Sequence, residues 1–146
     1  MSVATDHLDV APVPVRDAST LMLVRDADAG LEVCMLRRNL RSDFVGGAYV
    51  FPGGGADEHD RRPEAGAVCD GLEDASASAR VGVDRGGLAF WVAALRESFE
   101  EAGVLLARRR GGGELLRFDD PAVEQRFASH RLAVDRGERR LVEDCH

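Results

Sequence analysis

The stretch R-E-S-F-E-E-A-G-V, residues 96–104, closes a segment in which apolar residues recur at intervals of three and four. This spacing predicts an amphipathic helix over residues 88–102. Gly103 follows the last apolar position and is expected to cap the helix at its C-terminus. We expect the buried stripe of this helix to consist of Leu88, Trp91, Leu95, Phe99 and Ala102.

Three carboxylates share the opposite face of this predicted helix. At the helical rotation of ~100° per residue, Glu97, Glu100 and Glu101 fall within about one quadrant, and Arg96 can pair with Glu100 one turn away. Like charges at this spacing repel, and acids near the C-terminus of a helix oppose its macrodipole. Two interpretations are open: a solvated acidic face, or ligands for a hard divalent cation such as Mg²⁺.

A second motif lies upstream, in residues 46–55, G-G-A-Y-V-F-P-G-G-G. Its aromatic and β-branched residues predict a short strand over residues 49–51, followed by a glycine turn that Pro52 opens. Glycines leave the backbone accessible, so a ligand could approach it closely. An ordinary turn is the other interpretation of the glycine cluster.

Together the two motifs resemble the box of the Nudix hydrolase family, G-x5-E-x7-R-E-(apolar)-x-E-E-x-G-(apolar). Residues 96–104 match its second half, although Ser98 stands where an apolar residue is usual. Gly54 matches the opening glycine within a common F-P-G-G lead, and Asp60 stands where the family has glutamate. Residues 61–95 separate Asp60 from the second half, so the box is split by an insertion.

A split box of this kind resembles the Nudix branch that includes the peroxisomal coenzyme A diphosphatases. The resemblance covers roughly residues 19–106. A coenzyme A motif of other Nudix enzymes, R-(S/A)-x3-R-x3-G-x3-F-P-G-G, is matched only in part. Arg38, Gly47 and residues 51–54 fit it, whereas Asn39 and Asp43 do not.

The resemblance implies an α+β fold, an α/β/α sandwich in which the box helix packs on a Nudix-like mixed sheet. The residues after Val104 are expected to be helical rather than strand-like, so this fold would be incomplete at its C-terminus. The expected organisation is a flexible N-terminal arm over residues 1–17 and a Nudix-like domain over residues 18–146. Within this domain, residues 61–87 are expected to be a poorly ordered loop insertion.

The resemblance also implies a reaction and a site. The activity would be divalent-metal-dependent hydrolysis of a diphosphate linkage in a nucleoside diphosphate derivative. Coenzyme A or an acyl-CoA is the first candidate substrate, with ADP-ribose, nucleotide-sugars or dinucleotides behind it. The alternative is a truncated or non-catalytic Nudix-like domain that binds a ligand or partner. The implied residues are Glu97, Glu100 and Glu101 as ligands of Mg²⁺ or Mn²⁺, Arg96 orienting them, Arg38, Gly53 and Gly54 binding substrate, and Asp60 and Gly103 in structural roles.

Other expectations come from local signals. A hairpin is predicted from a buried strand at residues 20–24 and a partner strand at residues 31–38. Asp120 and Pro121 predict the start of a helix that runs to Val134, and a short helix is expected from residue 138. An additional downstream carboxylate, which Nudix enzymes often recruit, is not singled out by the sequence. The candidates are Glu114, Glu124, Glu138 and Glu143.

Composition limits the remaining function classes. The 146 residues suit a single domain, and the net charge of −7 disfavours a nucleic-acid-binding surface. Three cysteines without CxxC spacing indicate neither a disulfide framework nor a zinc site, so reduced thiols and a cytoplasmic location are expected. Neither a signal peptide nor a membrane span is indicated, and the final D-C-H differs from the peroxisomal S-K-L address. The oligomeric state is not indicated.

Overall fold

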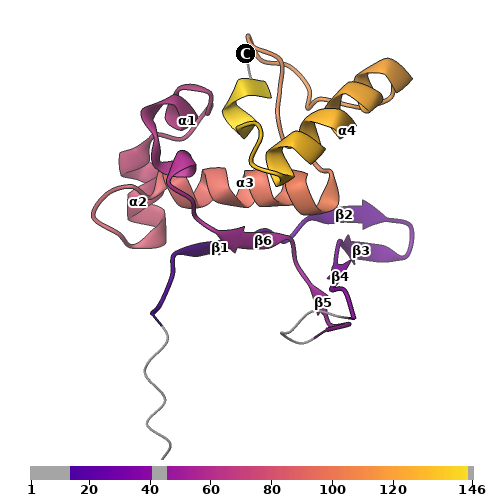
Figure 1. Ribbon diagram of the computed structural model, residues 1–146, viewed down its shortest axis with the longest axis horizontal. Coiled ribbons are helices and arrows are strands. Elements are labelled where there is room, and N and C mark those ends of the chain that lie inside the picture. The colour runs from indigo at the N-terminus through magenta and orange to yellow at the C-terminus, as the bar shows by residue number, and fades with distance from the viewer. Residues whose placement is uncertain (1–13, 41–45, 145–146) are drawn as a thin grey trace, which may run out of the picture.

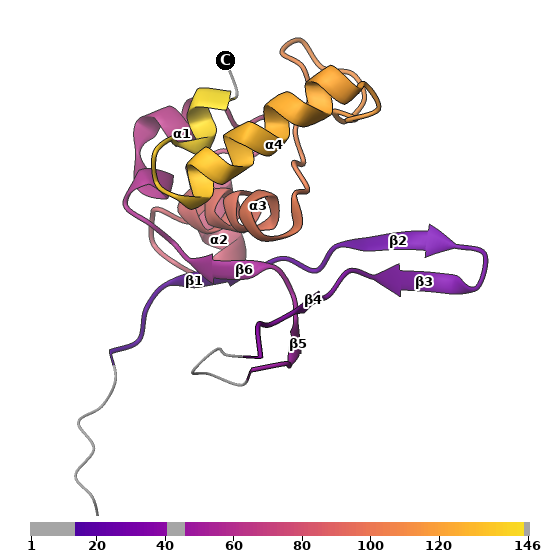
Figure 2. The same cartoon turned by 45° about the vertical axis from the view of Figure 1, so that its right-hand side comes forward.

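The computed structural model describes residues 14–40 and 46–144, and in this part of the chain the helices gather on one side of the strands (Figures 1 and 2). The strands are β1 (Ala18–Thr20), β2 (Val24–Ala27), β3 (Gly30–Val33), β4 (Leu36–Arg37), β5 (Tyr49–Val50) and β6 (Gly53–Gly55). The helices are η1 (His59–Arg61), α1 (Pro63–Ala67), α2 (Asp74–Val81), α3 (Leu88–Ala102), α4 (Pro121–Asp135) and η2 (Leu141–Asp144). The predicted α+β class is confirmed.

The strands form three separate antiparallel pairs, β1 with β6, β2 with β3, and β4 with β5. In the described residues they do not join into the single mixed sheet that was expected. The predicted hairpin does form, with Val24 opposite Val33 in the β2–β3 pair. This hairpin extends away from the helices (Figure 2), which leaves Val24 exposed.

The prediction of one continuous buried strand over residues 20–24 is wrong. The Leu21 N–H donates to the Pro52 carbonyl at 2.9 Å, whereas the Leu23 carbonyl accepts from the Cys34 N–H at 2.9 Å. The chain therefore changes pairing partner within this segment, and β1 ends before β2 begins.

The glycine run after Pro52 is a strand, which corrects the predicted turn. Gly54 lies opposite Ser19 in the β1–β6 pair. A Cβ on Gly53 would lie 2.8 Å from the Cα of Thr20, closer than real side chains approach. The glycines therefore allow a close approach between backbones, which is the reason a strand can form from residues with low strand propensity.

Helix α3 has the predicted bounds and is the central element of the fold. It contacts β1, β6, η1, α1, α2 and α4. Because it is covered on several sides, the predicted one-sided stripe is only partly right: Phe99 is 1% exposed, but Trp91 is 40% exposed. Arg96 and Ser98, which do not belong to the predicted stripe, are buried.

Burial of Ser98 is compatible with its hydroxyl group because the hydroxyl has carbonyl partners. Its Oγ donates to the Val104 carbonyl at 2.9 Å and lies 3.1 Å from the Leu95 carbonyl oxygen. A buried hydroxyl that makes hydrogen bonds avoids most of the cost of leaving water. The serine that departs from the apolar pattern of the box thus links the end of α3 to the segment that follows it.

Residues 61–87 contain helices α1 and α2, so the expectation of a poorly ordered loop is wrong. The Asp74 carboxylate, at the start of α2, accepts hydrogen bonds from the backbone N–H groups of Leu88 and Gly86, each at 3.0 Å. These two bonds lower the pKa of the Asp74 carboxyl group. The Ser78 hydroxyl accepts from the Gly87 N–H at 2.9 Å. The insertion thus supplies partners for the unpaired N–H groups at the start of α3.

Gly87 offers a direct test of this docking. A Cβ there would collide with the backbone of Ser78 and Ala77, and neither backbone can move without displacing α2. We expect Gly87→Ala to lower the free energy of unfolding by about 1–3 kcal/mol, the usual cost of overpacking. Urea unfolding followed by circular dichroism measures this.

The matched control is Gly66→Ala in α1. A Cβ at Gly66 meets only the Leu88 side chain, at an ordinary 3.4 Å. This variant is expected to be as stable as the wild type or slightly more stable, because alanine is the better helix former. Equal stabilities for the two variants would contradict the packing of α2 against the start of α3.

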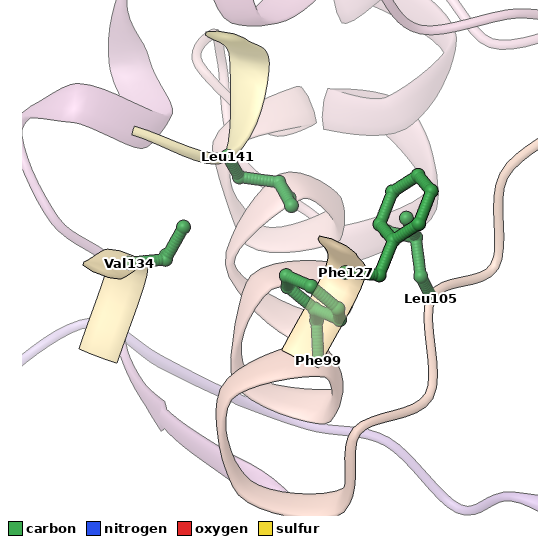
Figure 3. Packing of buried hydrophobic residues seen from close by; sticks show 5 residues of the cluster. All are labelled: Phe99, Leu105, Phe127, Val134 and Leu141. Atoms are coloured by element: carbon green, nitrogen blue, oxygen red, sulfur yellow. The ribbon is translucent and has the colours of Figure 1, made fainter. Parts of the chain in front are cut away.

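The C-terminal part of the chain covers the end of α3. As predicted, Asp120 caps α4, its Oδ1 accepting from the Ala122 N–H at 2.7 Å, and the short helix expected from residue 138 begins at Leu141. Figure 3 shows the apolar cluster formed here. Its buried members are Phe99, Leu105, Phe127, Val134 and Leu141.

No helix in the described ranges is long and apolar enough to span a membrane. Cys34 and Cys69 are free thiols, the first exposed and the second half-buried. Burial raises the pKa of the Cys69 thiol. Cys145, Asp43 and the first 13 residues of the predicted N-terminal arm lie outside the described residues.

Candidate active site

Arg96 lies at the centre of a buried charge cluster that joins η1 to α3. Its guanidinium donates to Asp60 through two nitrogens, Nε to Oδ1 at 3.1 Å and Nη2 to Oδ2 at 3.0 Å. Nη1 donates to Glu97 Oε1 at 2.9 Å and to Glu100 Oε2 at 3.0 Å, while Nη2 also donates to the Gly55 carbonyl at 2.8 Å. The predicted contact of Arg96 with Glu100 is therefore present, and Arg96 binds Asp60 as well.

Asp60 is held in place by η1 and the turn before it. Its Oδ2 accepts from the Asp57 N–H at 2.8 Å, and its side chain is only 3% exposed. The carboxylate of Asp57 lies 3.6 Å from Arg96 Nη2 but is 64% exposed. Asp57 was not singled out by the sequence, because an acid in an acidic, polar run carries no signal of its own.

The charge of Arg96 is stabilised by these partners. Burial alone would lower the pKa of its guanidinium, but the hydrogen bond and charge of Asp60, with the charges of Glu100 and Glu97, raise the pKa overall. The guanidinium thus stays protonated although its side chain is only 10% exposed. A buried cation is tolerated in this way when it is fully paired.

For two of the glutamates, Glu97 and Glu100, burial affects the pKa more strongly than the charge of Arg96 does. Burial is the largest cause that raises the pKa of Glu97 and of Glu100, and Arg96 only partly counteracts it. Repulsion adds to the effect, from Glu101 on Glu97 and from Asp135 on Glu100. The interpretation of a solvated acidic face is thus wrong for Glu97 and Glu100, whose side chains are each 13% exposed.

Asp135, the last residue of α4, is a downstream carboxylate that the sequence analysis missed. It is near enough to raise the pKa of Glu100, and only the packing of α4 on α3 brings it there. Among the four candidates named from sequence, Glu143 instead accepts a hydrogen bond from Arg140 at 2.9 Å.

Strand β6 lies against the acidic face of α3. The Gly53 N–H donates to Glu101 Oε2 at 3.0 Å, and a Cβ on Gly54 would collide with the Glu97 carboxylate. The structure therefore brings the F-P-G-G motif and the three glutamates together. This is the arrangement that the resemblance of the two motifs to one box implied.

The chain matches no protein-family model. Among solved structures, it is similar to the crystal structure of a NUDIX hydrolase from Alicyclobacillus acidocaldarius, with a TM-score of 0.57 and 29% sequence identity. The fold is Nudix-like. The similarity covers 85% of this chain and 54% of that structure, so the chain spans about half the length of its neighbour.

The Nudix-like site can be tested for its fit to a divalent cation. Among the described residues, no group of three or more His, Cys, Asp or Glu side chains is arranged to hold a metal ion. Glu97 and Glu100 converge on Arg96, while Glu101 bonds to Gly53. The donors are nevertheless carboxylate oxygens, which Mg²⁺ and Mn²⁺ prefer, and the raised pKa values of Glu97 and Glu100 reflect burial and an excess of negative charge. In donor type and charge the residues fit such an ion, given rotation of the side chains.

Arg38 lies apart from this Nudix-like site. It follows β4, and its N–H donates to the Ala48 carbonyl at 2.9 Å. The β4–β5 pair lies away from α3 in both views (Figures 1 and 2). The described structure therefore does not bring Arg38 together with the glutamates.

At Gly54 an added side chain would meet the acidic face of α3 directly. We expect Gly54→Ala to displace the Glu97 carboxylate and to lower the free energy of unfolding by about 1–3 kcal/mol, because the added methyl group overpacks the contact. The control is Gly55→Ala, where the nearest atom lies 3.9 Å from a built Cβ. Chemical denaturation of both variants measures the difference, and an equally stable Gly54→Ala protein would contradict the described position of Glu97.

Proposed function

We propose that the chain belongs to the Nudix hydrolase family and hydrolyses a diphosphate linkage in a nucleoside diphosphate derivative, with a divalent metal ion. The observation that carries this proposal is the Arg96 cluster, which joins Asp60 to Glu97 and Glu100 across the split box. Similarity to the NUDIX hydrolase from Alicyclobacillus acidocaldarius supports the reaction class.

Each residue of the cluster has a distinct task in this proposal. Glu100 and Glu101 are the principal ligands of Mg²⁺ or Mn²⁺, and Glu97 serves as a further ligand or as the general base. When bound, the ion neutralises the diphosphate and lowers the pKa of a coordinated water. Arg96 holds the Glu97 and Glu100 carboxylates through Nη1. The absence of side chains at Gly53 and Gly54 lets β6 lie directly against Glu97 and Glu101, beside the proposed metal site.

Coenzyme A or an acyl-CoA is the first candidate substrate. The split box and the partial coenzyme A motif support it, namely Arg38, Gly47 and residues 51–54. ADP-ribose, nucleotide-sugars and dinucleotides contain the same linkage and are the alternatives. In each case hydrolysis breaks the diphosphate so that each product keeps one of its two phosphates, and inorganic phosphate is not released.

A second candidate is a Nudix-like domain that binds its ligand without hydrolysis. One observation favours it: Glu97 and Glu100 are both engaged by Arg96. This candidate predicts nucleotide binding without turnover.

A hydrolysis panel distinguishes the two. The purified chain is incubated with coenzyme A, acetyl-CoA, ADP-ribose and a dinucleotide, with Mg²⁺, with Mn²⁺ or with chelator, and monophosphate products are separated by chromatography. The enzyme proposal expects metal-dependent products from at least one compound. If every compound stays intact while calorimetry detects binding of one of them, the non-catalytic candidate is correct.

A further inference from the structure

Arg131 occupies an unusual position for a cation, on the face of α4 that packs against α3. Phe127 and Val134 precede and follow it by one helical turn, and both are buried in the apolar cluster. Residues at this spacing share one side of a helix. Arg131 is accordingly half-buried, and its guanidinium lies at the end of α3.

The guanidinium of Arg131 binds the backbone of the two glutamates that are proposed as principal ligands. Nε donates to the Glu100 carbonyl at 2.7 Å, and Nη2 donates to the Glu101 carbonyl at 2.8 Å. The last four carbonyls of a helix have no partner within it. One of these, on Phe99, accepts from the Gly103 N–H at 3.0 Å. Arg131 supplies donors for the next two.

Gly103 leaves the space that this contact needs. Its φ is 69°, a left-handed conformation that favours glycine. A Cβ at this position would also lie 3.3 Å from Arg131 Nη1, which is tighter than nearly all real contacts. The glycine of the box therefore permits both the turn at the end of α3 and the approach of Arg131.

We propose that Arg131 is a positioning residue that fixes the backbone of Glu100 and Glu101 for metal binding. This inference rests on the proposed function. A planar guanidinium can hold two neighbouring carbonyls at once, and the apolar packing of Phe127 and Val134 anchors the helix that carries it. Its positive charge also offsets the negative end of the α3 macrodipole, where two further negative side chains are unfavourable. Helix α4, which lies outside the box, thus supports α3, which carries the proposed metal ligands.

Titration with Mn²⁺ tests this role directly. Free Mn²⁺ is quantified by electron paramagnetic resonance in solutions of the wild-type chain, Arg131→Met, Arg131→Lys and Arg136→Met, each below its melting temperature. Residues that orient metal ligands typically contribute 10–100-fold to metal affinity. We therefore expect Arg131→Met to bind Mn²⁺ at least about tenfold more weakly than the wild type.

The two other variants separate geometry from charge. Arg131→Lys keeps the charge but replaces the planar pair of donors, and is expected to bind Mn²⁺ more weakly than the wild type while remaining as well folded. Arg136→Met removes an exposed charge at the end of the same helix, and is expected to bind as the wild type does. An Arg131→Lys protein with wild-type affinity overturns the proposal, as does an Arg136→Met protein weakened as much as Arg131→Met.

The outcome also distinguishes this inference from the proposed function. If the wild-type chain binds Mn²⁺ and hydrolyses a diphosphate, but Arg131→Met binds the ion equally well, only the positioning role is wrong. If the folded wild-type chain binds no Mn²⁺, the proposed metal-dependent function fails and the positioning role fails with it.

Discussion

Replacing Arg96 with methionine is expected to lower the free energy of unfolding by about 3–5 kcal/mol, the cost of breaking a buried ion pair by removing one partner. The loss is large because Asp60, 3% exposed, would be left buried without its cationic partner. Glu97 and Glu100 would also repel each other without the shared Nη1 donor. Urea unfolding of wild type and variant at neutral pH gives the difference.

The matched control for Arg96 is an exposed arginine in an equally short ion pair. Arg25 binds Glu32 at 2.7 Å, but the two side chains are 79% and 50% exposed. We expect Arg25→Met to cost less than about 1 kcal/mol, as exposed pairs do. Adding Asp60→Asn to Arg96→Met should restore part of the lost stability, because it removes the unpaired buried charge. Equal effects of Arg96→Met and Arg25→Met would show that the cluster is not buried as described.

Helix α3 could be predicted from the sequence because its determinants are local. Apolar spacing defined its length, and Gly103 marked its end. Its buried face could not be predicted in the same way. A hydrophobic stripe assumes that one side is covered, whereas α3 is covered on several sides. Arg96 and Ser98 are therefore buried with hydrogen-bond partners, while Trp91 is exposed.

Small residues explain why the sequence did not predict helix α2 or strand β6. Helix α2 buries Ala77 and Ser78, which give almost no apolar periodicity. Its stability comes from bonds between Asp74 and the start of α3, which are distant in the sequence. Likewise, Gly53 and Gly54 form a strand because their missing side chains admit β1 and Glu97.

The same distinction between local patterns and tertiary contacts applies to the candidate site. The resemblance to the Nudix box selected Arg96, Asp60 and the glutamates, because they lie in one linear motif. Asp135 and Arg131 have no motif and reach the site only through tertiary packing, while Asp57 stands at an unspecified position between Gly54 and Asp60. No local pattern distinguishes such residues from ordinary surface charges.

Glu100→Gln is expected to reduce kcat/KM for the diphosphate substrate by at least about 100-fold, since loss of a metal ligand should cost no less than loss of an outer-sphere partner. The stability of the metal-free chain should not fall. Burial raises the pKa of the Glu100 carboxyl group, so its ionised form is costly in the folded state, and a neutral amide of similar shape avoids that cost. The amide oxygen can still accept from Arg96 Nη1.

This separation of activity from stability distinguishes Glu100 from Arg96, whose loss should reduce both. The measurement pairs steady-state hydrolysis in Mg²⁺ with thermal unfolding in chelator, and Glu73→Gln, at an exposed glutamate just before α2, serves as the control. Full activity in Glu100→Gln would remove Glu100 from the proposed metal site. A loss of both activity and stability would instead indicate that Glu100 acts through the Arg96 cluster alone, because the carboxylate would then be needed to hold the guanidinium rather than a metal ion.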